Sequence, residues 1–185
     1  MKKHIITACL YTAITAVLLG VIYPLLITGL AHLAFPAKAN GSLISRNGEV
    51  IGSHLIGQPF TGPTYFHSRP SAAGTGYDAA NSSGSNLAPT SKALIDRVAA
   101  SVSTEAAATP VPVDLVTTSA SGLDPDITPA AALYQVPRLA SVRGLPQATV
   151  RQLVISHIKP RQLGLLGEPT VNVLDLNLAL DQLKP

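Results

Sequence analysis

Residues 5–35 read IITACLYTAITAVLLGVIYPLLITGLAHLAF, and the rest of the chain is organised around this stretch. The run contains no Asp, Glu, Lys or Arg, and few polar residues interrupt its aliphatic side chains. As a helix it would be about 45 Å long, which exceeds the roughly 30 Å hydrocarbon core of a bilayer. We therefore predict a membrane-spanning helix, with residues 1–36 as an N-terminal transmembrane anchor.

A cleaved secretory signal is the alternative for this stretch, because Lys2 and Lys3 form a basic start and Ala37-Lys38-Ala39 resembles a signal peptidase site. The apolar part of a signal usually spans only about 7–15 residues, however, so the length favours a retained anchor. Two lysines precede the span, and the first acidic residue, Glu49, comes much later. This charge bias predicts a cytoplasmic N-terminus and a single extracytoplasmic domain over residues 37–185.

One feature of the span points to a contact with another membrane helix. Small residues or proline recur at every fourth position, and small side chains let helices approach closely in lipid, where packing rather than hydrophobicity holds helices together. Pro24 lacks a backbone donor and should bend the helix in its outer third. The predicted packing positions are Ala8, Thr12, Ala16, Gly20, Pro24 and Thr28.

The composition of the remaining residues limits the classes of function. After Phe35 the chain has eleven basic and ten acidic residues, and such a near-neutral domain is a poor nucleic-acid binder. The only cysteine, Cys9, lies inside the span, so the exported part has no disulfide. These features are typical of a bacterial envelope protein with one modest core.

Local signals place both strands and helices in this domain, without a regular βαβ rhythm, so we predict a single α+β domain. Asn47-Gly48 predicts a hairpin turn, and Thr128 followed by Pro129 predicts a helix start, with a kink at Pro137. Strands are expected at residues 42–45, 50–57, 64–67, 114–117 and 170–174. Helices are expected at 91–105 with fraying at 106–108, at 130–141, from Pro146 onward, and at 176–183 after a cap at Asp175. A long loop is expected at 69–89.

A catalytic constellation is not evident in the sequence. Ser156 and Lys159 match the S-x-x-K pattern of penicillin-interacting enzymes, but the companion S-D-N and K-T-G elements are missing. Asp124 and Asp126 suit a hard cation or, more simply, the capping of the following helix. The five histidines show no metal-ligand spacing, so no metal site is predicted, and we expect Arg69, Arg138 and Arg143 to form salt bridges with Asp114, Asp124 or Asp126.

Several blocks, in one order behind one anchor, resemble the C subunit of the Kdp-type potassium-transporting P-type ATPase. The resemblance covers most of the chain, and the combination of blocks is specific. The blocks are ANGSLI at 39–44, IGQPF at 56–60, YFHSRPSA at 65–72, SGSNLAPT at 83–90, SASGLDPDITPAAALYQVPRLASVRG at 119–144 and VNVLDLNLALD at 171–181.

The resemblance implies a non-catalytic subunit of a high-affinity, ATP-driven potassium import complex in the bacterial inner membrane. Its implied partners are the potassium-conducting subunit and the P-type ATPase subunit, which handle K+ and ATP, so no cofactor is expected on this chain. The family's C subunit is described as assembling the complex and as a catalytic chaperone that raises the nucleotide affinity of the ATPase subunit. An extracytoplasmic domain conflicts with direct nucleotide contact; the one residue that the family suggests for such a contact is Gln135.

The positions that match the family pattern are interpreted as fold or interface determinants. Asp126 and Thr170 depart from the expected pattern and are not treated as family sites. Two other classes of function stay open: a membrane-anchored envelope hydrolase using Ser156 and Lys159, and a module that binds a small ligand. The matching positions are Gln58, Arg69, Pro70, Ser71, Ser121, Gly122, Asp124, Gln135 and Arg138.

Overall fold

The computed structural model describes residues 1–105 and 110–183 of the chain. The expected fraying at residues 106–108 lies outside the described residues. The structure divides into two compact units, Met1–Ile51 and Gly52–Pro185, which we describe separately. The predicted boundary between anchor and domain at residue 36 stays a prediction, because a compact unit does not by itself mark where a membrane ends.

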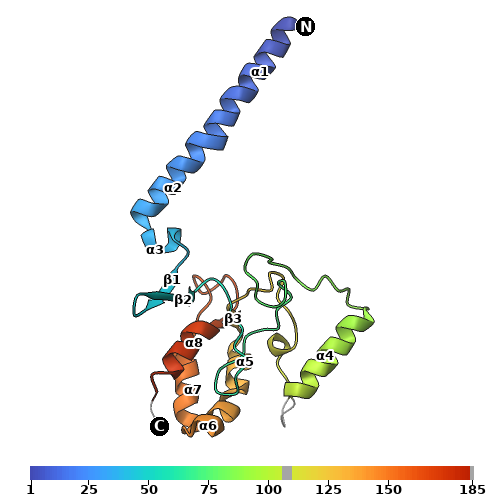
Figure 1. Cartoon of the computed structure of the whole chain (residues 1–185), viewed down its shortest axis with the longest axis vertical. Helices are drawn as coiled ribbons and strands as arrows, with labels where there is room; N and C mark the ends of the chain where they lie inside the picture. Colours follow the sequence, from blue (N-terminus) through green and yellow to red (C-terminus); the bar gives the residue numbers. More distant parts are fainter. Residues whose placement is uncertain (106–109, 184–185) are drawn as a thin grey trace. The chain divides into compact units, whose positions relative to one another are not determined.

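The first unit is dominated by one helical rod, Lys2–Ala34, which is long and apolar enough to cross a membrane (Figure 1). The rod consists of α1 (Lys2–Val17), the π-helical turn η1 (Leu18–Ile22) and α2 (Tyr23–Ala34). Pro24 cannot donate a hydrogen bond, and its ring crowds the carbonyl one turn earlier. The wider π turn before Pro24 is the irregularity that stands where we expected a bend.

A hairpin completes the first unit, after the single turn α3 (Pro36–Ala39). Strands β1 (Leu43–Arg46) and β2 (Glu49–Ser53) pair as a two-stranded sheet. Asn47 and Gly48 both have positive φ angles, of 54° and 83°, as a two-residue type I′ turn requires. The predicted hairpin and its turn are therefore confirmed.

The second unit combines a small sheet with packed helices, which confirms the predicted α+β class. Its sheet is antiparallel with strand order β3-β5-β4, and Val171 in the central strand pairs with Ile127 on one side and Ile158 on the other. The elements are α4 (Lys92–Glu105), the 3₁₀ turn η2 (Val113–Leu115), β3 (Asp126–Ile127), α5 (Pro129–Tyr134), α6 (Val136–Arg143), α7 (Gln147–Ser156), β4 (Ile158–Lys159), β5 (Thr170–Asn172) and α8 (Val173–Leu180).

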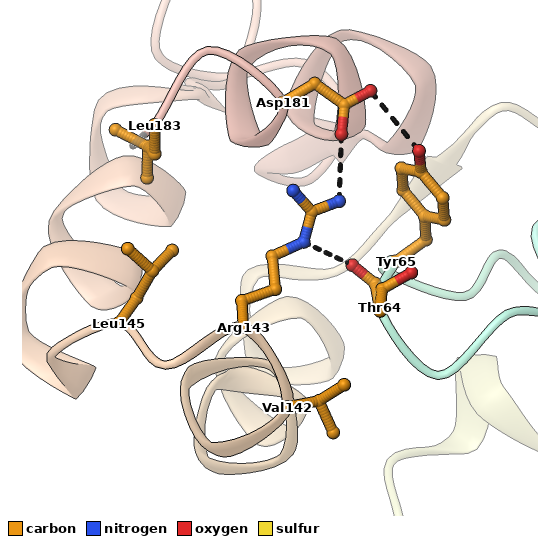
Figure 2. A pocket seen from close by; sticks show the side chains of 7 residues that line it. All are labelled: Thr64, Tyr65, Val142, Arg143, Leu145, Asp181 and Leu183. Carbon is orange, nitrogen blue, oxygen red and sulfur yellow. Dashed lines mark hydrogen bonds and ion pairs between the residues drawn. The ribbon is translucent and has the colours of Figure 1, made fainter. Parts of the chain in front are cut away.

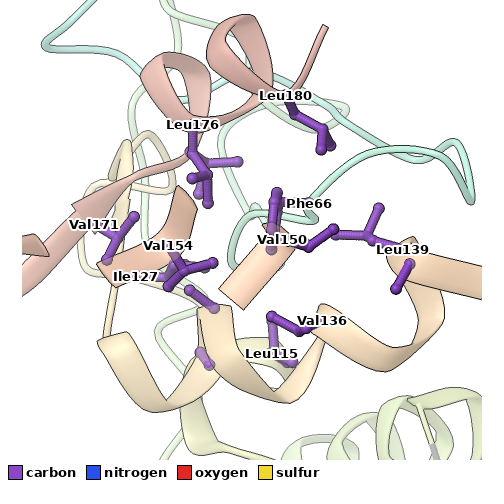
Figure 3. Close-up of a cluster of buried hydrophobic side chains, with 14 of the residues drawn as sticks. Phe66, Leu115, Ile127, Val136, Leu139, Val150, Val154, Val171, Leu176 and Leu180 are labelled. Carbon is purple, nitrogen blue, oxygen red and sulfur yellow. The ribbon is translucent and has the colours of Figure 1, made fainter. Parts of the chain in front are cut away.

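The core of this unit is aliphatic, with Phe66 as its one fully buried aromatic side chain (Figure 3). Helices α5 to α8 supply most of the cluster, and β3 and β5 add one residue each. Figure 3 shows Leu176 and Leu180 of α8 on one side of Phe66, and Val136 and Leu139 of α6 on the other. The core therefore joins the C-terminal half of the chain to a segment near residue 66.

The helix boundaries follow signals in the sequence at three points. The Thr128 hydroxyl accepts a hydrogen bond from the amide of Ala131 at the start of α5, as a helix N-cap does. Pro137 separates α5 from α6, as the predicted kink requires, because it removes a donor from the helical ladder. Pro146 immediately precedes α7, as the predicted helix start requires, and Val150 and Val154 of this helix are fully buried.

Three element predictions were wrong. Residues 64–67 belong to no strand, because the segment begins in a turn in which the amide of Tyr65 donates to the carbonyl of Gly62 at 3.2 Å. Residues 113–115 form a 3₁₀ turn where a strand was expected at 114–117. The last helix begins at Val173, because the Asn172 side chain, rather than Asp175, caps it by accepting from the amide of residue 175. Strands β3 and β4 were not predicted, since two residues carry too little periodicity to be recognised.

Candidate functional site

Side chains, rather than a neighbouring strand, hold the backbone of residues 63–67. We call this set the side-chain clamp; it consists of Gln135, Arg138, Arg143 and Asn177, which come from the α5–α6 junction, α6 and α8. A buried backbone must find partners for its polar groups, and here the partners lie between 68 and 111 residues away in sequence. The clamp thereby ties the middle of the chain to its C-terminal helices.

Gln135 lies at the centre of the side-chain clamp and is only 1% exposed. Its Oε1 accepts hydrogen bonds from the amide of His67 at 2.8 Å and from Nη2 of Arg138 at 2.7 Å. Its Nε2 donates to the carbonyls of His67 at 3.1 Å and Ala131 at 3.3 Å. The amide thus uses both acceptor positions and both donors inside the domain, which leaves no atom of this side chain for a nucleotide in this arrangement.

Arg138 and Asn177 extend the clamp on either side of Gln135. Arg138 donates to the carbonyls of Pro63 and Tyr65, and Asn177 both accepts from the amide of Phe66 at 2.8 Å and donates to its carbonyl at 3.0 Å. Burial lowers the pKa of Arg138 from its ordinary value, and the nearby carboxylate of Glu105 opposes that shift. Asn177 was not predicted as a site residue, although its spacing to Val173, Leu176 and Leu180 places it on the inner face of α8.

Arg143 closes the clamp beside a cavity of about 380 Å³ (Figure 2). Its Nε donates to the carbonyl of Thr64 at 2.7 Å, and Nη2 forms an ion pair with Asp181 at 2.9 Å. The guanidinium lies 4.9 Å from the centre of the Tyr65 ring, whose hydroxyl also contacts Asp181 at 3.4 Å. Arg143 was expected to pair with Asp114, Asp124 or Asp126, and this is wrong because α6 faces the end of α8. The cavity is lined by Thr64, Tyr65, Val142, Arg143, Leu145, Asp181 and Leu183.

A second polar cluster fixes the long loop that follows His67, and Arg69 is its centre. The guanidinium donates to the carbonyls of Thr117 at 3.4 Å and Thr118 at 3.3 Å. It also lies 3.5 Å from Asp124 and 3.8 Å from Asp114. The predicted salt bridges of Arg69 are confirmed, whereas Arg138 bonds to backbone carbonyls instead. Asp124 does not cap a helix; its Oδ1 accepts from the amide of residue 126.

Ser71 and Gly122 join the two loops of this cluster. The Ser71 hydroxyl donates to the carbonyl of Gly122 at 2.6 Å and accepts from the amide of Tyr77 at 2.8 Å. Gly122 has a φ of +66°, and a Cβ placed there would lie 2.5 Å from the carbonyl oxygen of Ser83 and 2.7 Å from the amide nitrogen of Ala73. Only glycine therefore fits this position.

The other positions of the family pattern lie around the same cluster. The Ser121 carbonyl accepts from the amide of Ser83 at 3.0 Å, and its hydroxyl accepts from the amide of the residue two positions later. The Gln58 carbonyl accepts from the amide of residue 60, and Pro70 is half-buried. The Tyr77 hydroxyl donates to the Arg69 carbonyl, and burial raises the pKa of Tyr77. Through these contacts the residues form a scaffold for the loops.

The small-residue positions of the apolar helix Lys2–Ala34 follow a winding stripe. A repeat of four residues advances about 40° per step on a helix of 3.6 residues per turn, so Ala8 and Thr28 do not share one face. The π turn at Leu18–Ile22 reduces this drift locally, because it contains more residues per turn. Gly20 lies within that turn, and no other part of the structure approaches within 4 Å of its Cβ position.

Ser156 and Lys159 each contact other groups in the structure. The Ser156 hydroxyl donates to the carbonyl of Leu153 at 2.8 Å, and Nζ of Lys159 lies 3.8 Å from Asp175. Asp175 also contacts Nδ1 of His54 at 2.7 Å.

Two further polar groups noted in the sequence also have internal partners. His67 faces Glu105. The carboxylate of Asp126 accepts from Thr170 and Asn172, so it neither caps a helix nor stands free for a cation. Among the described residues, no group of three or more His, Cys, Asp or Glu is placed to hold a metal ion.

Comparison with known proteins gives one consistent result. A model of the family described as "KdpC: K+-transporting ATPase, c chain" matches residues 5–182. A protein named "Potassium-transporting ATPase KdpC subunit" from Koribacter versatilis is 61% identical, over 100% of this chain and 97% of its own length. A relative of the same name from Acidobacterium capsulatum is 65% identical, over 98% of this chain and 99% of its own length. Another from Gemmatimonas aurantiaca is 58% identical, over 99% of this chain and 94% of its own length. The match extends over the apolar helix as well as the domain, and the chain therefore belongs to the KdpC family of K+-transporting ATPase c chains.

Proposed function

We propose that this chain is a non-catalytic accessory subunit that assembles and stabilises an ATP-driven potassium import complex. The observation that carries the proposal is the apolar helix Lys2–Ala34, because its most apolar window has no buried residue within the chain. Such a surface needs lipid or other membrane helices around it. In the proposed complex, the helix packs against the potassium-conducting subunit, and the P-type ATPase subunit is the second partner.

The charge distribution supports an extracytoplasmic domain. Lys2 and Lys3 precede the helix, and lysines and arginines close to a span are retained on the cytoplasmic side. In this orientation the domain lies on the side from which potassium enters. The orientation can be tested because Cys9 is the only cysteine: a Cys9→Ala chain with an added Ala80→Cys should react with an impermeant maleimide in spheroplasts. Protection until the membrane is lysed would place the domain in the cytoplasm.

An effect of the subunit on ATP affinity is proposed to act through assembly rather than through direct contact. The Gln135 amide, which the family resemblance singled out, is buried and fully hydrogen-bonded. Potassium and ATP are therefore assigned to the partner subunits, with no cofactor on this chain. If direct contact occurred, ATP would have to protect the domain from chemical labelling in the complex, a result that the proposal does not predict.

Assembly through the helix is tested by making the same substitution, glycine to leucine, at two positions of the helix. Gly20 belongs to the small-residue stripe, whereas Gly29 is nine residues further along and, at about 100° per residue, lies near the opposite side. When a tagged chain is purified from detergent extracts, Gly20→Leu should reduce the amount of the two large subunits recovered with it at least roughly tenfold. The reason is that the larger side chain prevents close packing of the helix at this position. Gly29→Leu is the control and should assemble normally. Equal recovery for both variants would reduce the helix to a simple anchor.

A further inference from the structure

The connection between β4 and β5 presents three leucines to solvent. We call residues 161–167 the leucine loop. Leu163 is 91% exposed, Leu165 81% and Leu166 60%, although leucine side chains favour the interior of a folded domain. The tip of the loop, residues 163–166, contains no polar side chain. Exposure of three neighbouring aliphatic side chains in one loop indicates a contact surface.

The leucine loop is held in one shape by its own hydrogen bonds. The amide of Gln162 donates to the carbonyl of Leu166 at 2.9 Å, and the amide of Leu166 donates back to the carbonyl of Gln162 at 2.9 Å. The amides of Gly164 and Leu165 also donate to carbonyls within the loop, at 3.1 Å each. An ion pair of 2.6 Å between Arg161 and Glu168 closes its base. The leucines are therefore presented on a rigid support.

The backbone at the tip is also in an unfavourable conformation. Leu163 has a φ of +54°, in the left-handed region that residues with a Cβ rarely adopt. A leucine that occupies this region with 91% of its surface exposed gains no packing within the domain to offset the conformational cost. The hydrogen bonds of the loop hold this conformation, and the exposed side chain of Leu163 is left available for a contact outside the domain.

A lipid bilayer matches this loop better than a protein surface does. Insertion into lipid requires that backbone polar groups be bonded internally, and four of the amides between residues 162 and 166 are bonded within the loop. Protein interfaces rely mainly on Trp, Tyr and Arg anchors, and leucine is under-represented among them. At the base, Lys159 and Arg161 are paired with the carboxylates of Asp175 and Glu168, so these pairs add no net charge beside the apolar tip.

We propose that the leucine loop inserts its tip into the interfacial region of the membrane as a second contact, in addition to the helix. The proposal rests on the anchoring part of the proposed function, since a chain held by its own helix keeps the bilayer at a high effective concentration. The contact would restrict how the domain turns above its anchor. Anchoring is tested separately, by co-elution of the full chain with nanodiscs.

The experiment uses the absence of tryptophan from the chain. Leu165→Trp is placed in the full chain, which is incorporated into nanodiscs of mixed neutral and anionic lipid with or without brominated acyl chains. The matched control is Ala80→Trp, at an exposed position of the loop that follows residue 69. We expect blue-shifted emission for Leu165→Trp and quenching by brominated lipid at least roughly twofold stronger than for the control, because apolar side chains reside at the acyl boundary.

Each other outcome overturns the proposal. Water-like emission from Leu165→Trp, with quenching equal to that of Ala80→Trp, would show that the tip stays in water. A blue shift that arises only after the other subunits of the complex are added would assign the tip to a protein partner. A second reporter, Leu163→Trp, guards against a local failure of the loop to fold at one position, and concordant negative results from both reporters refute lipid insertion.

Discussion

Replacing Gln135 by leucine removes the centre of the side-chain clamp while keeping a side chain of similar size. The substitution leaves the amide and carbonyl of His67 without the partners seen in the structure, and the carbonyl of Ala131 loses the hydrogen bond that Gln135 Nε2 donates to it. A buried polar group that loses its partner costs about 1–3 kcal/mol. Because residue 67 is only partly buried, we expect the lower part of this range for each group, and a total loss of about 2–4 kcal/mol in the free energy of unfolding.

The loss can be measured by pulse proteolysis of the full chain in detergent micelles across a urea series. A urea dependence of about 2 kcal/mol per molar converts the expected loss into a midpoint that is about 1–2 M lower. Gln152→Leu is the control, because Gln152 is exposed on α7 and surface substitutions usually change stability by less than about 0.5 kcal/mol. If the two variants had the same midpoint, the clamp would not stabilise the domain and our account of residues 63–67 would be wrong.

Three further predictions concern the same domain. Gly122→Ala should destabilise it by about 1–3 kcal/mol more than Gly144→Ala in the same urea assay, because both glycines have φ near +65° but only the first has backbone atoms within 3 Å of its Cβ position. Burial raises the pKa of Tyr77 in the folded domain above its value in the unfolded chain. The neutral Tyr77 side chain therefore contributes fully to the free energy of unfolding below about pH 10, and this contribution is lost as the pH rises through the folded pKa. In thermal melts, Tyr77→Phe should flatten this alkaline loss of stability. Thr128→Ala should lower the free energy of unfolding, measured in the same urea assay, by about 1 kcal/mol through the loss of the cap on the Ala131 amide. An unchanged free energy would show that Pro129 alone sets the start of α5.

Features that depend on local chemistry were predictable from the sequence. Asn47-Gly48 determines a turn because both residues tolerate positive φ, and the structure has both there. The start of α5 and its separation from α6 follow from a capping hydroxyl and from a proline without an amide hydrogen. The apolar helix likewise follows from composition alone. None of these features requires knowledge of a distant part of the chain.

Features that depend on distant partners were not predictable. Residues 64–67 have β-favouring side chains, but their backbone bonds to side chains that lie far along the sequence, and no propensity reports such partners. Asn172 and Asp175 are both good caps, and the burial of Val173 in the core decides in favour of the earlier start of α8. Asn177 escaped notice because a buried asparagine on an apolar helix face becomes meaningful only when its partner, Phe66, is known.

The residues of the family pattern form contacts within the domain, and this affects where a partner subunit can bind. Gln135 is almost fully buried, Arg69 donates hydrogen bonds to backbone carbonyls within the domain, and Gly122 is enclosed by other loops. A partner subunit that bound at these positions would have to replace existing hydrogen bonds, whereas an apolar surface exposed to water gains free energy when it is covered. Two exposed apolar surfaces of the described chain are the helix Lys2–Ala34 and the tip of the leucine loop. We therefore expect substitutions in the polar clusters to alter folding first, and substitutions on the two apolar surfaces to alter assembly or membrane contact while the domain stays folded.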